Sequence, residues 1–409
     1  MVLTTATLAT VAIPATSLAQ DATTINQGLT GDVTTTQTLN VVTENYGLTQ
    51  VEGQAVGNSA QGGNDTVNAT VTTTQNASAN VTAEDHVFGH NVGGDETLSL
   101  GTPVYVTTQS IANYNSHVAQ DANADVTLHQ TSTGAKVTAT TDIQAPNNAI
   151  YDSGEGDAVT EVNHTAYQVS NGRLNAAAWQ TSSSESNANT SATVHYSPSD
   201  NLYTASATNN YYGAYSDDRG SQDHDIHQDQ SAQTLARAEV YGGNMWNVAA
   251  QGTSVANNVD IENAGGYLGV TSNQHQVGSV YSQAYVQADE YGTADVSAVG
   301  IGNQLNAGNN DVTVQLDATQ IADGGVDVTS TFEGNTGYDS YISAEAYGNQ
   351  ALAYACAECK ADFNATSNQI NNGDVNATTN VTTSGSNRSI VSSAKAIGNS
   401  ATYYVSGGH

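Results

Sequence analysis

A short segment that ends in Gly-Asn recurs along this chain and constrains its fold more than any other feature. The pairs are Gly57-Asn58, Gly243-Asn244, Gly302-Asn303, Gly348-Asn349 and Gly398-Asn399, and the last three are spaced 46 and 50 residues apart. Because glycine and asparagine tolerate positive φ angles, we predict a turn at each pair. Self-similarity on this scale predicts a repeat architecture, in which each unit buries one face by stacking on its neighbours. Chance matches in a chain of low complexity are the alternative explanation.

The segments between these pairs alternate apolar and polar residues. Val314, Leu316 and Ala318, for example, alternate with polar side chains. A period of two is typical of strands that bury one face. We therefore predict an all-β chain that forms a repetitive, elongated β-solenoid or β-helix. With about 20 residues per turn and about 4.8 Å per rung, its body would extend roughly 90 Å. Disorder is the competing interpretation, and the sustained alternation argues against it.

The charge of the chain excludes some partners. Only 7 basic residues stand against 39 acidic ones, which gives a formal charge of −32. Too few lysines and arginines are present to neutralise phosphates, so nucleic acid is excluded as a natural partner. An anionic membrane surface is disfavoured for the same reason. Because 21 Tyr stand beside 3 Phe and 2 Trp, we expect Ala, Val and Thr to build a core of thin, closely stacked layers.

We predict four regions along the chain. Residues 1–19 are small and apolar and end in Ser17-Leu18-Ala19, which fits the cleavage site of a signal peptide. Residues 20–144 form an N-terminal β-repeat region, 145–232 a less regular region with longer loops, and 233–409 a C-terminal β-repeat region. We therefore expect export through the periplasm. A lipid anchor is not expected, since no cysteine follows the cleavage site.

Glutamines recur at short intervals in the N-terminal region. Gln37, Gln50, Gln61 and Gln75 lie 11 to 14 residues apart. The stretch that starts at Gln61 approximates Gln-x-Gly-x-x-Asn-x-x-x-Ala and resembles the repeats of curlin-type fibre subunits, although its spacing is one residue off. In such repeats Gln and Asn side chains stack in ladders between rungs. We therefore predict polar ladders inside the solenoid.

One cluster contains residue types that bind metal ions. The densest charged run of the chain includes Asp223, His224, Asp225 and His227. Carboxylates and imidazoles are ligands of divalent cations, so this run is a candidate metal site, with Ca2+ as a possible ion. Because the spacing matches no defined metal-binding loop, a solvated acidic loop is the alternative interpretation.

The two cysteines form a Cys-x-x-Cys pair, Cys356 and Cys359. Nothing around them has a helical pattern, whereas a redox-active pair starts a helix. We therefore predict a local disulfide that stabilises one turn of an exported protein.

Signatures of catalysis are missing from the sequence. It contains no nucleophile elbow, phosphate-binding loop or dinucleotide fingerprint. We expect no enzymatic activity and no cofactor. Paired carboxylates for glycoside cleavage can still be drawn from 39 acidic residues, so a solenoid enzyme that acts on polysaccharide stays open as an alternative.

In its composition, leader, length and Ala-x-Gly-Asn segments, the chain resembles the D component of the holdfast anchor proteins of stalked alphaproteobacteria. The resemblance implies a cell-surface protein, associated with the outer membrane, that ties an adhesive polysaccharide to the outer envelope. It also implies a curlin-like companion subunit and a secretion-pore lipoprotein as partners. From the repeats themselves we expect self-association. A calcium-dependent matrix or S-layer protein is a further alternative.

Overall fold

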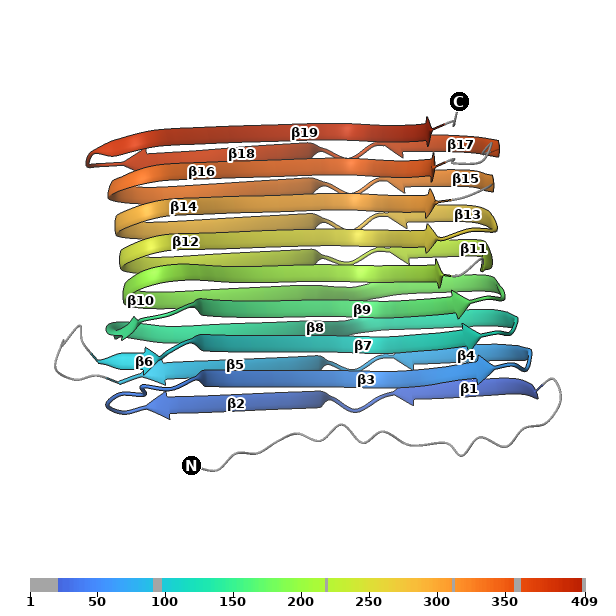
Figure 1. Cartoon of the computed structure of the whole chain (residues 1–409), viewed down its shortest axis with the longest axis horizontal. Helices are drawn as coiled ribbons and strands as arrows, with labels where there is room; N and C mark the ends of the chain where they lie inside the picture. The colour runs from blue at the N-terminus through green and yellow to red at the C-terminus, as the bar shows by residue number, and fades with distance from the viewer. Residues whose placement is uncertain (1–20, 91–97, 218–219, 311–312, 357–361, 407–409) are drawn as a thin grey trace.

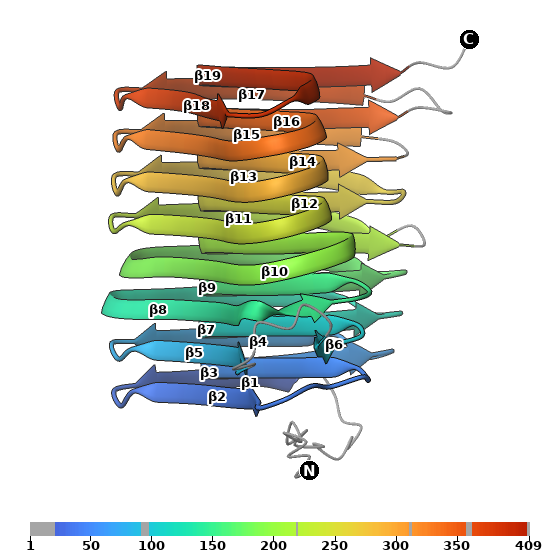
Figure 2. The ribbon, with the colours of Figure 1, turned by 90° about the vertical axis from the view of Figure 1, so that its left-hand side faces the viewer.

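In the computed structural model the chain is a parallel β-solenoid. The structure describes residues 21–90, 98–217, 220–310, 313–356 and 362–406. All the regular secondary structure within these residues is β-strand. All strand pairings are parallel, and they join the strands into one continuous sheet that winds around a central axis. Figures 1 and 2 show the coils stacked from the N-terminal to the C-terminal end. The predicted all-β solenoid is therefore confirmed. The predicted signal peptide, residues 1–19, lies outside the described residues.

Eight coils are built from the described residues. Coil one contains β1 (Asp21–Leu29), β2 (Val33–Val41) and β3 (Thr49–Asp65). Coil two contains β4 (Ala69–Ala77), β5 (Val81–Gly89), β6 (Ser99–Gly101) and β7 (Val104–Gln120). Coil three contains β8 (Ala124–Ile150) and β9 (Gly154–Ser170). Coil four is the single long strand β10 (Arg173–Asp217). Coil five contains β11 (Ser221–Gln230) and β12 (Thr234–Asn263), and coil six contains β13 (Tyr267–Gln276) and β14 (Val280–Asn309). Coil seven contains β15 (Thr313–Ala322) and β16 (Val326–Cys356). Coil eight contains β17 (Asp362–Asn371), β18 (Val375–Thr383) and β19 (Asn387–Ser406).

Each coil has three walls, which we call A, B and C in chain order. Wall A consists of β1, β4, β11, β13, β15, β17 and the first parts of β8 and β10. Wall B consists of β2, β5, β18, the later part of β8, the middle of β10 and the first parts of β12, β14 and β16. Wall C consists of β3, β7, β9, β19 and the last parts of β10, β12, β14 and β16.

The predicted coil length of about 20 residues is wrong. Paired residues of successive coils are farther apart: Gln75 and Gln130 are separated by 55 residues, and Asn303 and Asn349 by 46. A coil with three walls needs this many residues to close. Eight such coils at about 4.8 Å per strand give roughly 38 Å along the axis, not 90 Å.

Small side chains fill the interior, as the composition predicted. The apolar inward positions are mostly Ala and Val, and the largest fully buried side chains include Tyr203, Tyr212 and Phe332. They form narrow clusters between the walls instead of one thick core. No helix among the described residues is long and apolar enough to cross a membrane.

The stretch 145–232 does not interrupt the solenoid, contrary to our expectation of longer loops. It contains β9 and all of β10, which at 45 residues is the longest strand among the described residues. Both pair with the coils on either side. Serine, asparagine and tyrosine replace valine there, so the apolar pattern is weak while the backbone pairing stays regular.

Candidate functional site: an aromatic groove on a ladder-stabilised solenoid

Four of the five Gly-Asn pairs lie inside strands of wall C and not at turns. At Gly302-Asn303 in β14, pairing with the next coil passes from Ile301 directly to Asn303. A Cβ atom on Gly302 would lie 2.5 Å from the carbonyl oxygen of Gly348, so the glycine allows a close approach of two backbones. Positive φ angles occur instead at Gly134, Gly265 and Gly266 among the described glycines. Gly57-Asn58, Gly348-Asn349 and Gly398-Asn399 occupy the same position in β3, β16 and β19. Gly243-Asn244 lies elsewhere, between walls B and C in β12.

One asparagine of every coil belongs to a continuous hydrogen-bonded column. The eight residues are Asn58, Asn113, Asn163, Asn210, Asn257, Asn303, Asn349 and Asn399. Each of the first seven donates a hydrogen bond from its Nδ2 to Oδ1 of the asparagine in the next coil, at 2.7 to 2.8 Å. Each also donates to a wall A carbonyl of the next coil, at 2.8 to 3.2 Å. The six central asparagines are fully buried, so these bonds satisfy amides that would otherwise be costly to bury.

A glutamine column on wall A runs in the opposite direction. It consists of Gln27, Gln75, Gln130, Gln180, Gln228, Gln274, Gln320 and Gln369. From Gln75 onward, each Nε2 donates to Oε1 of the glutamine in the preceding coil at 2.7 to 2.9 Å. Each Nε2 also donates to the carbonyl that follows the ladder asparagine on wall C, at 2.7 to 3.0 Å. The two columns therefore join wall A to wall C. The predicted polar ladders are present, although of the four closely spaced glutamines only Gln75 takes part.

The predicted metal-binding residues do not come together. All four lie on β11, where successive side chains alternate between the interior and the surface. His224 points inward and is 2% exposed, whereas Asp223, Asp225 and His227 face outward. His227 pairs with Asp225 at 3.2 Å and stacks on Trp179. The four side chains cannot surround one ion, because the strand places His224 on the opposite face. No group of three or more His, Cys, Asp or Glu in the described residues is arranged to hold a metal ion.

His224 is a neutral core residue. Its Nε2 donates to Oε1 of Gln222 at 3.0 Å, so Nδ1 is the acceptor for the Tyr212 hydroxyl at 2.7 Å. Burial lowers the pKa of His224 to about 3. The imidazole therefore stays uncharged in the folded protein at any physiological pH.

His224 is expected to make the fold sensitive to acid. An unfolded imidazole titrates near pH 6.5, so this contribution to stability is complete above that pH and is lost as the pH falls from 6.5 towards 3. Between pH 7 and pH 5 the loss is about 2 kcal/mol. Chemical denaturation of the wild type and of His224→Gln at both pH values measures it, because the variant lacks this loss. Equal pH dependence in both proteins would contradict the prediction.

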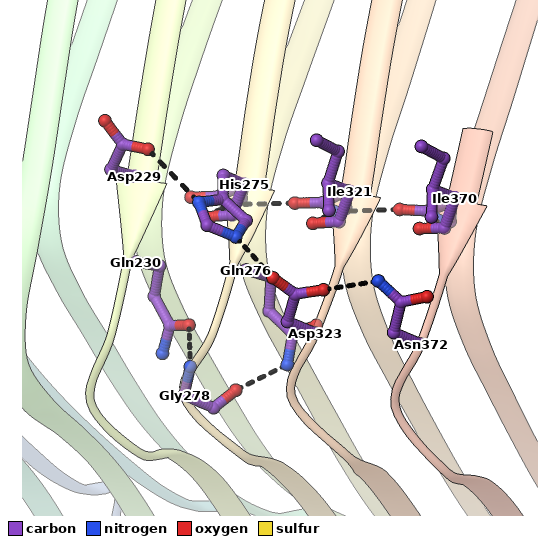
Figure 3. A network of polar contacts seen from close by, with 12 residues as sticks. Asp229, Gln230, His275, Gln276, Gly278, Ile321, Asp323, Ile370 and Asn372 are labelled. Atoms are coloured by element: carbon purple, nitrogen blue, oxygen red, sulfur yellow. Dashed lines mark hydrogen bonds and ion pairs between the residues drawn. The ribbon is translucent and has the colours of Figure 1, made fainter. Parts of the chain in front are cut away.

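A second polar network follows the turns between walls A and B (Figure 3). His275 lies between Asp229 and Asp323, at 3.8 Å and 2.8 Å. Asp323 also accepts a hydrogen bond from Asn372 at 2.7 Å, and these bonds hold the pKa of Asp323 below its usual range. Gly278 donates its backbone N–H to Oε1 of Gln230 at 3.2 Å. The turns of coils five to eight are thus joined along the axis.

A groove lies on the surface at the corner where wall B turns into wall C. This corner of the ribbon is at the left-hand edge of Figure 1. Its volume is 790 Å³, and it extends over coils four to eight. Trp246 and Tyr338 line it with 55% and 52% of their surfaces exposed. The two rings meet edge to face, with centroids 6.2 Å apart. Trp246 lies over Gly292 of the next coil, where a Cβ atom would be 3.1 Å from its ring.

Polar groups surround these rings. The Arg388 guanidinium lies 5.3 Å from the centre of the Tyr338 ring, and its Nε donates to Asp339 at 2.9 Å. Hydrogen bonds from Arg388 hold the pKa of Asp339 below its usual range, so this pair stays ionised. Asn244 and Glu290 also line the groove. Broad apolar faces bordered by a few oriented polar groups are the usual chemistry of a ligand site.

A smaller hollow of 290 Å³ adjoins the same corner on coils three to six. It is lined by Glu155, Asp200 and Asp295. Burial raises the pKa of Asp295, and Asp200 accepts a hydrogen bond from Asn247 at 2.6 Å. The corner is therefore acidic toward its N-terminal end.

Two other aromatic columns differ from the groove. Trp179 is stacked between His129 and His227, with ring planes inclined by 13° and 2°. His164 is stacked in the same way between Tyr114 and Tyr211. Neighbouring rings in these columns cover one another's faces, whereas the edge-to-face pair in the groove leaves ring surface open. The groove is therefore the better candidate binding site.

Sequence reasoning missed the groove residues. The only signal was composition, since one of the two tryptophans and several of the 21 tyrosines meet at this corner. Among the predicted site residues, only Asn244 lines the groove. Cys356 ends β16, but its side chain and all of Cys359 lie outside the described residues, so the disulfide stays a prediction.

The fold and the groove define a class of protein: a parallel β-solenoid with an aromatic groove along its outer surface. Within that class, the chain belongs to the holdfast attachment protein D family, whose model matches residues 43–325. Its role is therefore structural, in anchoring the holdfast at the cell envelope. No curated protein and no solved structure matches the chain.

Proposed function

We propose that this protein retains the adhesive polysaccharide of the holdfast by binding it in the aromatic groove at the corner between walls B and C. The observation that carries the proposal is the half-exposed pair Trp246 and Tyr338, held on a rigid sheet. Aromatic rings offer apolar faces to the C–H faces of sugar rings, and nearby amide and carboxylate groups can bond the hydroxyls. The groove runs across successive coils, which suits a polymer more than a small ligand.

Charge indicates the class of polysaccharide. The chain carries a formal charge of −32, and Arg388 in the groove is already paired with Asp339. A polyanionic sugar would be repelled by this surface. The ligand that we propose is therefore a neutral or positively charged polysaccharide.

The remaining parts of this function rest on the family and on the sequence. The protein would be exported through the periplasm and held at the outer membrane. Its partners there would be a secretion-pore lipoprotein and a curlin-like anchor subunit. A solenoid with an exposed groove can bind polysaccharide while its ends or other walls contact such proteins.

Replacement of Trp246 or Tyr338 by alanine is expected to weaken polysaccharide binding about tenfold each, since central aromatic contacts dominate binding energy. Isothermal titration of the purified protein with purified holdfast polysaccharide measures the change. Trp179→Ala is the matched control, because this tryptophan is stacked between two histidines outside the groove. Equal affinity of wild type, Trp246→Ala and Tyr338→Ala, with unchanged melting temperatures, would contradict the proposed site.

A further inference from the structure

The groove at the corner between walls B and C runs parallel to the solenoid axis. Three consecutive residues from each of coils four to eight line it, beginning with 196–198 in coil four and ending with 386–388 in coil eight. Strand pairing stacks these triplets in register, since Asn244 pairs with Glu290 and Glu290 pairs with Thr336. The corner rises along the left-hand edge of Figure 1, past β12, β14 and β16. A linear molecule in the groove would therefore cross the strands instead of following one of them.

One rim of the groove presents a polar side chain in each coil. Asn244, Glu290, Thr336 and Ser386 occupy equivalent positions in coils five to eight, and all four are exposed. Successive coils are paired strands, which lie about 4.8 Å apart. This rim therefore offers a group that can hydrogen-bond a ligand about every 4.8 Å along the axis.

The opposite rim presents flat side chains over the same coils. The Trp246 ring of coil five extends over Gly292 of coil six, where an added Cβ would lie 3.1 Å from it, so one ring covers two coils. The Tyr338 ring of coil seven and the Arg388 guanidinium of coil eight, 5.3 Å from the ring centre, cover the next two. A flat surface therefore follows the polar rim along four coils.

The floor between the rims is fixed by core packing. Met245 and Tyr291, which line it, are only 2% and 4% exposed. The Tyr291 ring fills the space beside Gly337, because an added Cβ there would overlap the ring. The rims are thus held at a constant register on paired coils, and a ligand would not have to reorder them.

We propose that the groove binds an unbranched, extended polysaccharide chain parallel to the solenoid axis, with one sugar unit on each coil. This inference rests on the proposed function. The coil spacing of about 4.8 Å is close to the length of one pyranose unit in a chain of equatorially linked sugars. Each unit would turn a C–H face to the flat rim and a hydroxyl to the polar rim. Coils four to eight therefore form five successive subsites.

The matched spacing selects one class of chain. A chain with axial linkages winds into a helix and loses the register after one or two units, and a branch would meet one of the rims. Contacts at successive coils also act together, because a unit held on one coil keeps its neighbour close to the next. A chain bound in this way leaves only when several contacts break at once.

Isothermal titration with fragments of purified holdfast polysaccharide, sorted by length from two to eight sugar units, tests the register. Affinity is expected to rise with each unit up to five, by at least about 100-fold in total, and to change less than about twofold from five to eight units. Affinity that is already constant at two units would overturn the proposal. So would affinity that keeps rising through eight units.

A pair of substitutions tests the direction of the chain. Thr336→Trp places a large side chain across the groove at coil seven, and it is expected to weaken binding of five-unit fragments at least about tenfold. Leu202→Trp is the matched control, because Leu202 is exposed on wall C beside the groove, where a chain that followed coil four would lie. It should bind like the wild type. The reverse result would show that the chain follows the strands, and would overturn the proposal.

A third variant measures the end of the groove. Ser386→Trp obstructs only coil eight, so its affinity should stop rising at four units instead of five. An unchanged limit of five units would contradict one unit per coil. Melting temperatures show whether each variant is folded, and if Thr336→Trp melts early, the comparison of Ser386→Trp with Leu202→Trp decides.

Failure of the proposed function would have a different signature. If no fragment binds the wild type, or if Trp246→Ala binds all fragments like the wild type, the groove is not the binding site and both proposals are wrong. If Trp246→Ala abolishes binding while affinity does not depend on length, the groove is the site and only the register of one unit per coil is wrong.

Discussion

Replacement of Asn257 by leucine is expected to lower the free energy of unfolding by about 3–5 kcal/mol. Leucine has nearly the same size but no polar atoms. Asn210 would lose the acceptor of a 2.8 Å hydrogen bond, Asn303 would lose the donor of another, and the His275 carbonyl would lose a 3.0 Å bond. All these groups are remote from water in the centre of the stack, so no solvent molecule replaces the lost partner.

Denaturation by guanidinium chloride, followed by circular dichroism, measures this change. Asn273→Leu is the matched control, because Asn273 lies on the outward face of β13, next to the ladder residue Gln274. Its unfolding free energy should change by less than about 0.5 kcal/mol. An equally small change for Asn257→Leu would show that the asparagine column contributes little to stability.

Replacement of Gly278 by valine is expected to cost about 3 kcal/mol or more, because the new side chain has no space. Gly278 lies in the turn between β13 and β14, where an added Cβ would overlap backbone atoms of Ala232 in the preceding coil. Its N–H also bonds Oε1 of Gln230 at 3.2 Å (Figure 3), which keeps the two coils close together. Relief of the overlap would separate coils that are paired along their whole length.

Thermal melting compares this variant with Gly31→Val, which makes the same change in the corresponding turn of the first coil. Open space surrounds Gly31, so the melting temperature of Gly31→Val should differ little from that of the wild type. Similar melting of both variants would contradict the close packing of the turns.

Some features of the fold followed directly from local pattern. Alternation around Val314, Leu316 and Ala318 predicted a strand with one buried face, and these three residues are buried in β15. Scarcity of large apolar residues predicted thin layers of Ala, Val and Thr, and repeated Gln and Asn predicted polar ladders. The Gly-Asn pairs showed where similar positions recur, but their interpretation as turns was wrong, because the same two residues also suit a site where two backbones meet closely.

The sequence by itself determined the strands, the side of each strand that faces the interior, the acidity of the surface and the stacking of amides. The strands and their inward sides depend on neighbours one or two positions away in the chain. The acidity depends on composition, and the recurrence of Gln and Asn along the chain indicated the amide stacking. Only the tertiary structure decided the coil length of 46 to 56 residues, since a strand alternates in the same way whether its partner is 20 or 50 residues distant. The tertiary structure also determined which residues meet in the groove. Trp246, Tyr338 and Arg388 are far apart in the chain and meet because the corner between walls B and C stacks one segment of each coil directly on the next.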